Sequence, residues 1–362
     1  MKLPSILFAF ALVLSIPAFS QGTISGKIID AETRLPLQGA SVFAQNTTRG
    51  TVTDKEGNFS LYLNKGGYEV IISFTGYTSR LINYEAVSDR NFTLEMERTD
   101  NSLSEVIIQN TNEVADGWEQ YGNFFTRHFI GATPFAAKTV LLNPEVLKFY
   151  YYKRNDRLKI LATEPLEIRN EALGYIMRYE LDSFVHFFGN GINSYRGFCF
   201  FSEMDGTEEE KMLWKQNREQ AYLGSRLHFI RSYFDSSLKE NGFTVDMLSK
   251  TIANKFDRLT NPYDSVYYYF DNENYDAELW FPVKASIIYH KKAPEAEYLQ
   301  QYNLPADVQK QISYVDLSDA ILIKPNGYFI DQKSWINQGY WSWKNLADLL
   351  PYDYEVEDSS VE

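Results

Sequence analysis

The chain has 362 residues, enough for two domains, and its 44% hydrophobic and 23% charged residues are typical of a globular protein with a packed core. Aromatic residues make up 16% of the sequence, and this favours β structure because Tyr and Phe suit half-buried pleated surfaces. The formal net charge of −13 argues against nucleic acid as a partner, since phosphate contacts need clustered Lys and Arg. It also gives no help to binding an anionic membrane surface.

Residues 1–20 are predicted to be a secretory signal peptide. Lys2 supplies the positive start, the run Ile6–Leu14 is apolar throughout, and small residues precede Gln21. An uncleaved membrane anchor is the alternative, but the apolar run is short for ~30 Å of hydrocarbon and Pro17 ends it. No cysteine follows the run, so no lipid anchor is expected there. We expect an exported protein whose mature part has no transmembrane span.

Residues 21–98 alternate short β-type runs with turn residues. Gly57, after Asp54, supplies the positive φ of one tight turn. Short strands at this spacing, without a helical period, predict an antiparallel β-sandwich. The predicted strands are Thr23–Ile29, Ala40–Ala44, Gly50–Thr53, Asn58–Leu63, Tyr68–Phe74 and Asn91–Met96.

Five ordered motifs in this region resemble the carboxypeptidase-regulatory-like domain. They are Gly26-x-x-x-Asp30, Pro36-Leu-x-Gly-Ala-x-Val42, Thr48-x-Gly-Thr-x-Thr-Asp-x-x-Gly-x-Phe-x-Leu61, Ser73-Phe-x-Gly-Tyr77 and Leu103-Ser-Glu-Val-Ile-Ile108. The resemblance implies a transthyretin-like, seven-stranded sandwich without peptidase activity. In Gram-negative envelope proteins this domain commonly precedes other parts, including those of TonB-dependent receptors. It therefore implies a place in the periplasm or at the periplasmic face of the outer membrane.

Two features that resemble sites are interpreted as structural. The oxygens of Asp54, Glu56 and Asn58 sit on one short turn, which offers too few ligands for calcium, so Asp54 is expected to cap its own turn. Cys199 is the single cysteine and lies in the apolar run Gly197–Phe201, where a buried, inert thiol is expected.

Residues 99–116 are predicted to be a linker with a short strand at Val106–Ile108. Residues 117–362 are predicted to be an α+β domain with one long helix over 207–242. Thr207 and Glu210 form a capping box at its start, and Asn241-Gly242 is a stop signal. An apolar stripe at helical spacing joins them through Leu223, Leu227, Ile230, Phe234 and Leu238.

The remainder of this domain is predicted to be a mostly antiparallel sheet. Asn155-Asp156 marks a hairpin between two of its strands. The expected strands are Val146–Tyr152, Leu158–Leu161, Leu166–Ile168, Tyr175–Leu181, Phe198–Phe201, Ser265–Phe270, Ser286–Tyr289, Ala320–Ile323 and Tyr328–Ile330. Three stretches resemble an uncharacterised region that accompanies this sandwich in other exported proteins, with no activity to carry over: Pro165–Tyr175, Trp214–Phe229 and Leu349–Tyr354.

The candidate ligand-binding residues lie on the predicted helix. Arg218, Tyr222, Ser225 and His228 follow at i, i+4, i+7 and i+10, with Asn217 and Arg231 adjacent. Such a face can grip a carboxylate or phosphate through Arg. The alternative, which we favour, is that these side chains tie the helix to neighbouring strands through buried hydrogen bonds.

Aromatic runs offer a second hypothesis, a stacking surface for a glycan or peptide. They are Phe149–Tyr152 and Tyr267–Phe270, with Trp335, Trp341 and Trp343. The favoured alternative is that alternate members of each run fill the core of a sheet.

No catalytic, phosphate-binding, dinucleotide-binding or metal-binding motif is found, so no catalytic residue, metal or cofactor is predicted. The sequence favours a non-catalytic, exported binding or scaffold protein with an envelope protein or a glycan or peptide as its partner. One alternative is a hydrolase that assembles Glu203 or Asp205 with His186 or His228. Another is an accessory to a TonB-dependent receptor, by analogy alone.

Overall fold

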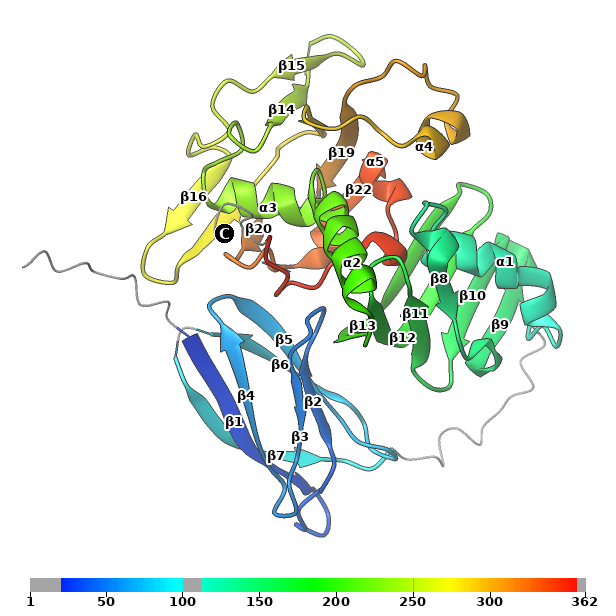
Figure 1. The fold of residues 1–362 in the computed structure, drawn as a ribbon, viewed down its shortest axis with the longest axis vertical. Coiled ribbons are helices and arrows are strands. Elements are labelled where there is room, and N and C mark those ends of the chain that lie inside the picture. The colour runs from blue at the N-terminus through cyan, green and yellow to red at the C-terminus, as the bar shows by residue number, and fades with distance from the viewer. Residues whose placement is uncertain (1–20, 87, 100–111, 250, 357–362) are drawn as a thin grey trace, which may run out of the picture.

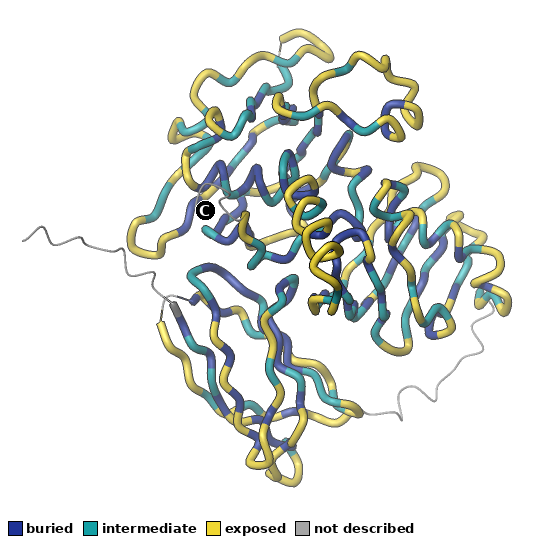
Figure 2. The backbone as a smooth tube through the Cα atoms, viewed as in Figure 1, coloured by how far each residue is buried: buried dark blue, intermediate teal, exposed yellow. Residues whose placement is uncertain are grey.

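The computed structural model describes residues 21–86, 88–99, 112–249 and 251–356 (Figure 1). The predicted signal peptide and the strand predicted at Val106–Ile108 lie outside these residues. The described chain is mostly β, with an N-terminal sandwich followed by an α+β region that holds three further sheets. Figure 2 shows that the buried backbone follows the strands, while exposed residues gather in the loops and along one helix.

The N-terminal part is a sandwich of a three-stranded sheet, in the order β4-β1-β7, and a four-stranded sheet, in the order β3-β2-β5-β6. Alternate residues of β4 are buried, so Phe59, Leu61 and Leu63 reach the core between the sheets. The strands are β1 Gln21–Asp30, β2 Ser41–Ala44, β3 Gly50–Val52, β4 Asn58–Asn64, β5 Gly67–Ser73, β6 Arg80–Glu85 and β7 Arg90–Met96.

The seven-stranded sandwich expected from the family resemblance is confirmed. The strand that pattern reasoning missed is β6, since it is an edge strand in which Tyr84 is the one buried side chain. The pairing of β1 with β7 is parallel, whereas β1 with β4 is antiparallel. Strand period alone does not determine which of the two pairings forms.

The next part of the chain is a six-stranded antiparallel sheet covered by helix α1, Gly117–Phe129. Its long strand β12 pairs with β13 along one edge and with β11 and then β10 along the other. Phe125 and Phe129 of α1 are fully buried against the sheet. The strands are β8 Thr139–Leu141, β9 Leu147–Tyr152, β10 Arg157–Ala162, β11 Leu166–Asn170, β12 Tyr175–Phe187 and β13 Ile192–Glu203.

The predicted hairpin at Asn155-Asp156 is confirmed, with Asp156 in the left-handed region at φ 46° between β9 and β10. Helix α1 was not predicted.

The last part contains a five-stranded sheet, in the order β15-β14-β18-β19-β22, and a four-stranded sheet, in the order β16-β17-β20-β21. All their pairings are antiparallel, which confirms the expected α+β class. The strands are β14 Phe243–Leu248, β15 Phe256–Arg258, β16 Tyr268–Asp271, β17 Asp276–Leu279, β18 Ala285–Tyr289, β19 Gln311–Leu317, β20 Ile321–Ile323, β21 Phe329–Ile330 and β22 Trp335–Gly339. The short helices are α4 Ala296–Gln301 and α5 Tyr340–Trp343.

The prediction of one helix over residues 207–242 is wrong in its extent. The structure has two helices, α2 Glu208–Tyr222 and α3 Arg226–Phe234. The capping box of Thr207 and Glu210 is confirmed. The helix is interrupted at Gly224, whose φ of +82° is left-handed. Ser225 then caps α3 by accepting a hydrogen bond from the backbone N–H of His228. Both helices bury apolar residues, so the apolar stripe continues across the break and conceals it in the sequence.

Candidate functional site

The sandwich meets the rest of the chain through the turn between β2 and β3. The backbone N–H of Asn46 donates to the Cys199 carbonyl at 2.6 Å, and the N–H of Phe201 donates to the Thr47 carbonyl at 3.0 Å. These bonds attach the turn to β13, and the Phe43 and Phe200 rings pack 5.4 Å apart beside it. The six-stranded sheet therefore continues, through a single bridge, into the sandwich.

The C-terminal segment reinforces this junction from the other side. The N–H of Tyr352 donates to the Asn46 carbonyl at 2.7 Å. The carboxylate of Asp353 accepts from the Thr48 N–H at 2.9 Å and from the Thr48 hydroxyl, and it lies 3.3 Å from the Arg49 guanidinium. The Asp353 side chain is only 5% exposed, so these bonds replace water around its charge.

Arg231 of α3 binds the same segment through its guanidinium. Its nitrogens donate to the carbonyls of Tyr354 at 2.8 Å, Tyr352 at 3.0 Å and Asn326 at 3.2 Å. The Asn326 side-chain amide in turn donates to the Gly67 carbonyl of the sandwich at 3.0 Å. One charged side chain thus links α3, the C-terminal segment and, through Asn326, the start of strand β5 in the sandwich.

An ion triad around the buried Lys324 completes the junction. The ammonium of Lys324, 3% exposed, lies 2.9 Å from Asp276 and 2.9 Å from Glu85 of the sandwich strand β6. The Lys324–Asp276 pair is buried, with Asp276 8% exposed, so removing Asp276 deprives a buried ammonium of its buried partner and costs about 3–5 kcal/mol, whereas Glu85 is 45% exposed and contributes less. The triad therefore joins β6 of the sandwich to the four-stranded sheet β16-β17-β20-β21.

Burial at the junction also shifts the pKa values of two glutamates. Burial raises the pKa of Glu69 on β5, which is also hydrogen-bonded to Tyr328. Burial likewise raises the pKa of Glu180 on β12, with Ser73 and Ser79 of the sandwich as hydrogen-bonding neighbours. In both cases the shift arises from burial where parts of the chain meet, and it disfavours the charged form.

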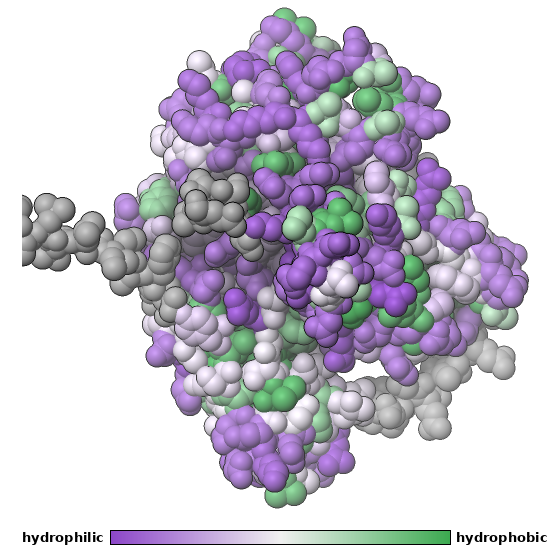
Figure 3. All heavy atoms as spheres, in the orientation of Figure 1, coloured by the Kyte–Doolittle hydropathy of each residue, from purple (hydrophilic) through white to green (hydrophobic). Residues whose placement is uncertain are grey.

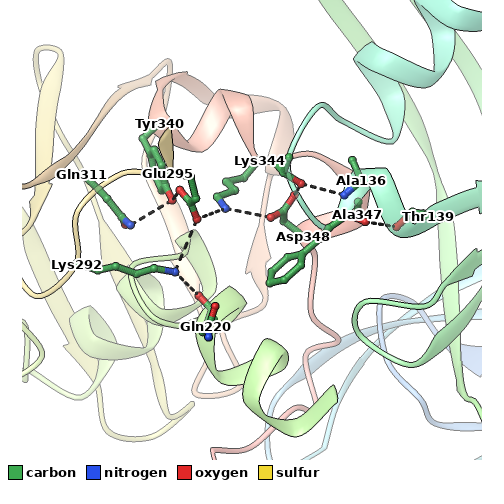
Figure 4. A network of polar contacts seen from close by, with 12 residues as sticks. Ala136, Thr139, Gln220, Lys292, Glu295, Gln311, Tyr340, Lys344, Ala347 and Asp348 are labelled. Atoms are coloured by element: carbon green, nitrogen blue, oxygen red, sulfur yellow. Dashed lines mark hydrogen bonds and ion pairs between the residues drawn. The ribbon is translucent and has the colours of Figure 1, made fainter. Parts of the chain in front are cut away.

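A second polar cluster joins the last part of the chain to the six-stranded part (Figure 4). The Lys344 ammonium lies between two carboxylates, 2.8 Å from Glu295 and 3.1 Å from Asp348. The Thr133 hydroxyl, which follows α1, donates to Asp348 at 2.7 Å, and the Tyr340 hydroxyl donates to Glu295.

The charges of this cluster compensate one another. Burial raises the pKa of Asp348. Burial acts in the same direction on Glu295, but Lys344 and the Tyr340 hydroxyl outweigh it and hold the pKa of Glu295 below its usual range. Because opposite charges are in direct contact, the cluster stabilises the packing of these two parts of the chain against each other.

The sequence-predicted residues Arg218, Tyr222, Ser225 and His228 do not share one helix face, because the break at Gly224 separates them. Arg218 donates to the carbonyls of Leu173 at 2.7 Å and Gly174 at 3.2 Å, and it pairs with Glu203 at 2.9 Å. The Arg218 guanidinium also lies over the Tyr175 ring, 3.9 Å from its centroid.

The other three predicted residues gather at the break itself. Ser225 is occupied as the cap of α3, and the rings of Tyr222 and His228 pack 4.7 Å apart. His228 accepts the Gly224 N–H at Nδ1, and burial lowers its pKa to about 4. All four side chains thus contact the chain itself, and their role in ligand binding stays a prediction. Sequence reasoning named Arg231 as a neighbour but missed Asp353, Asn326 and Lys324, because no local pattern marks residues that pair over such distances.

The residues named for a hydrolase lie apart. His186, on β12, shares a hydrogen bond with Asn193 through Nδ1 at 2.6 Å and packs against Phe124. His228, on α3, packs instead against Phe243 and Tyr289 of another core. Glu203 is paired with Arg218. Within the described ranges no group of three or more His, Cys, Asp or Glu side chains is placed to hold a metal ion.

The two features interpreted as structural are consistent with that interpretation. Cys199 is fully buried, and burial raises the pKa of its thiol far above its usual range, which leaves it protonated and unreactive. The Asp54 carboxylate accepts from the N–H groups of Glu56 at 3.0 Å and Asn58 at 2.8 Å, as a turn cap does.

The family model of the CarboxypepD_reg-like domain matches residues 24–108, which include the sandwich. This sandwich is a carboxypeptidase-regulatory-like domain. The junction described above therefore joins a regulatory-like domain to an α+β region that the family model does not cover.

Curated TonB-dependent receptors are similar to a part of this chain. The TonB-dependent receptor SusC of Bacteroides thetaiotaomicron is 41% identical over 66 residues, which is 18% of this chain and 6% of the receptor. The TonB-dependent receptor P39 of Formosa agariphila is 30% identical over 106 residues, which is 28% of this chain and 10% of the receptor. The aligned segment thus spans about a tenth or less of the length of these relatives.

Among solved structures, the 3-chlorocatechol 1,2-dioxygenase of Rhodococcus opacus 1CP is similar over 22% of this chain and 61% of its own, with a TM-score of 0.18 and 12% identity. A likeness of this size carries no argument about function. In the part of the chain that the structure describes, no helix is long and apolar enough to cross a bilayer. The sequence relatives associate the regulatory-like domain with the cell envelope and with a receptor-associated or binding role.

Proposed function

We propose that the protein is a non-catalytic binding or scaffold protein, exported to the periplasm or the periplasmic face of the outer membrane. The observation that carries this proposal is the junction, in which the regulatory-like domain is bonded to the α+β region through main-chain bridges, the Asp353 carboxylate and the Lys324 triad. A domain fixed in this way presents the surfaces of both regions to a partner in one defined arrangement.

The polar side chains of the described region also fit this proposal better than catalysis. The candidate acids and bases are engaged in contacts within the chain, as Glu203 is with Arg218 and Asp348 is with Lys344. The cavity of about 370 Å³ at Asp30, Glu97 and Arg98 lies at the end of the sandwich. The Asp30 carboxylate there is occupied by backbone and side-chain donors, among them Arg98.

An accessory to a TonB-dependent receptor is the second candidate. It is favoured by the relatives, because each aligned segment belongs to a protein named as such a receptor. In this version the partner of the scaffold is a receptor of that class.

Proximity labelling in a host that exports the full-length chain tests the proposal. A labelling enzyme fused to the protein is expected to mark envelope proteins reproducibly, and TonB-dependent receptors among them would support the accessory version. N-terminal sequencing of the recovered chain would show whether cleavage before Gln21 has taken place. A cytoplasmic pool, or an exported pool that marks nothing above a freely diffusing periplasmic control, would contradict the scaffold.

A further inference from the structure

An exposed set of aromatic rings lies on the six-stranded part, at the opposite end of β13 from the contact with the sandwich. This aromatic surface consists of Trp118 and Tyr121 of α1, Tyr151 of β9 and Phe188 at the turn between β12 and β13. Trp118 and Phe188 are each 38% exposed, and Tyr121 and Tyr151 are partly exposed. Contiguous exposed rings are a feature of interaction sites, since isolated chains ordinarily bury such surface.

The rings follow one another in steps comparable to the length of a single pyranose unit. Tyr121 and Tyr151 are 6.3 Å apart between centroids, with an angle of 23° between their planes. Phe188 lies 6.2 Å from Tyr151 at an angle of 68°, so its ring stands edge-on beside the other two. Trp118 lies beside Tyr121, because both rings pack on the buried Phe149 ring, at 6.5 and 6.4 Å. The arrangement brings together residues of three elements that are distant in sequence.

Each ring is held in place before any ligand arrives. The Tyr151 hydroxyl donates to the Asp156 carboxylate at 2.6 Å. Phe188 packs against the rings of His186 at 4.5 Å and Phe124 at 5.4 Å. The Trp118 ring lies over Gly122, where an added Cβ would come within 2.7 Å of it. Fixed aromatic rings give a large contact area at a low cost in conformational entropy.

The surroundings of the rings determine the chemistry of the occupant. Neutral amides flank them, namely Gln120 and Asn123 on α1 and Asn190 at the β12–β13 turn, all exposed. The neighbouring charges have both signs: Asp116 (which accepts from Gln120), Glu119 and Asp156 are acidic, and Arg127, Lys153 and Arg154 are basic. This mixture gives no net attraction to an ionic ligand, whereas amides and phenols exchange hydrogen bonds with hydroxyl groups.

We propose that the aromatic surface binds a neutral oligosaccharide, an inference that rests on the proposed binding function. The C–H faces of successive sugar rings would pack on Trp118, Tyr121 and Tyr151, with Phe188 edge-on beside them, and the equatorial hydroxyls would reach the flanking amides. The cavities at Asp30 and at Lys324 lie elsewhere, and the exposed rings form an open surface, so the ligand is an extended chain.

Affinity electrophoresis of the mature full-length chain tests the proposal, with native gels that contain xyloglucan, galactomannan, laminarin or amylopectin. At least one of these neutral polysaccharides is expected to slow the protein. Trp118→Ala and Tyr121→Ala should each weaken that binding about tenfold, the value expected when one stacked ring is lost. Tyr269→Ala removes a 64% exposed tyrosine of β16 and should leave the affinity unchanged.

A further variant tests whether the position of the Trp118 ring matters when the number of aromatic rings is unchanged. Gly122→Ala displaces the Trp118 ring but removes no aromatic residue, and it too should weaken retardation while the thermal unfolding curve shows a folded protein. Retardation by none of the four polysaccharides overturns the proposal, as does wild-type affinity in folded Trp118→Ala. Concentration-dependent self-association that Trp118→Ala abolishes would assign the surface to a second copy of the chain and also overturn it. Proximity labelling of envelope partners needs no polysaccharide, so failure of this inference is distinguishable from failure of the proposed function.

Discussion

At the scale of single residues, the junction relies on charged side chains that bind main-chain atoms of distant segments. Asp353 accepts from the Thr48 backbone and Arg231 donates to two carbonyls of the same C-terminal segment. The identity of these residues matters because a carboxylate offers acceptors alone and a guanidinium donors alone. A neutral substitute of the same size supplies the wrong kind of hydrogen bond.

Asp353→Asn is expected to lower the free energy of unfolding by about 1–3 kcal/mol, because the buried amide cannot accept from the Thr48 N–H and hydroxyl as well as pair with Arg49. Urea titration followed by fluorescence measures the change. Glu95→Gln removes an exposed ion pair with Arg34 and is the control, with an expected change below about 0.5 kcal/mol. Equal effects of the two substitutions would show that Asp353 contributes no more than a surface charge.

His228 gives a prediction for the dependence of stability on pH. Burial lowers its pKa in the folded protein to about 4, whereas the unfolded value is 6.5. The contribution to stability is therefore fully present above pH 6.5 and is lost as the pH falls toward 4, since the unfolded chain binds the proton first. NMR titration of the imidazole C–H signals should show one histidine with a pKa near 4 that is absent in His228→Gln. A titration near pH 6.5 would contradict the burial of this ring.

At the scale of elements, the break between α2 and α3 determines where the predicted ligand residues lie. Gly224 reaches a φ of +82° with the Gln311 side chain and the Tyr289 ring directly beside it. A residue with a side chain meets both the backbone strain and these neighbours. The turn therefore redirects the chain so that Arg218 faces the loop at Leu173 while His228 enters the last core.

Gly224→Ala is expected to destabilise the protein by about 1–3 kcal/mol, through the left-handed backbone and the contact with Tyr289 at 2.7 Å from the added Cβ. Gly191→Ala is a matched control, because Gly191 has a φ of +68° and nothing within 4 Å of an added Cβ. Both substitutions place a side chain on a left-handed backbone. The additional destabilisation by Gly224→Ala, measured by thermal unfolding, therefore reports the packing around Gly224. No excess would mean that the neighbours of Gly224 move aside freely.

At the scale of the whole molecule, the C-terminal segment contacts the regulatory-like domain, the six-stranded part and the last part of the chain. Lys344 and Asp348 join the last part to Thr133, and Ala347 donates its N–H to the Ile130 carbonyl at 3.0 Å. A few residues later Tyr352 and Asp353 bind the turn of the regulatory-like domain. Hydrophilic residues dominate the face shown in Figure 3.

Truncation after Leu350 is expected to uncouple the regulatory-like domain, because it removes the Tyr352 and Asp353 bonds and keeps Lys344 and Asp348 in place. Differential scanning calorimetry should then show two transitions, and limited proteolysis should release the sandwich as a stable fragment. Truncation after Trp343 removes the Lys344 cluster as well, so the α+β region should also unfold at a lower temperature. A single transition at the wild-type temperature after the shorter truncation would show that the junction holds without the C-terminal segment.

Local pattern alone determined six of the seven sandwich strands, the hairpin at Asp156 and the capping box at Thr207, because each depends on side-chain period or on turn chemistry within a few residues. The break at Gly224 was not determined in this way, since a glycine inside an apolar stripe is compatible with a continuous helix until its neighbours are known. The fastening by Asp353, Arg231 and Lys324 was decided only by the tertiary structure. Those residues pair across up to 305 positions of sequence, and a long-range contact leaves no mark in the pattern of either segment.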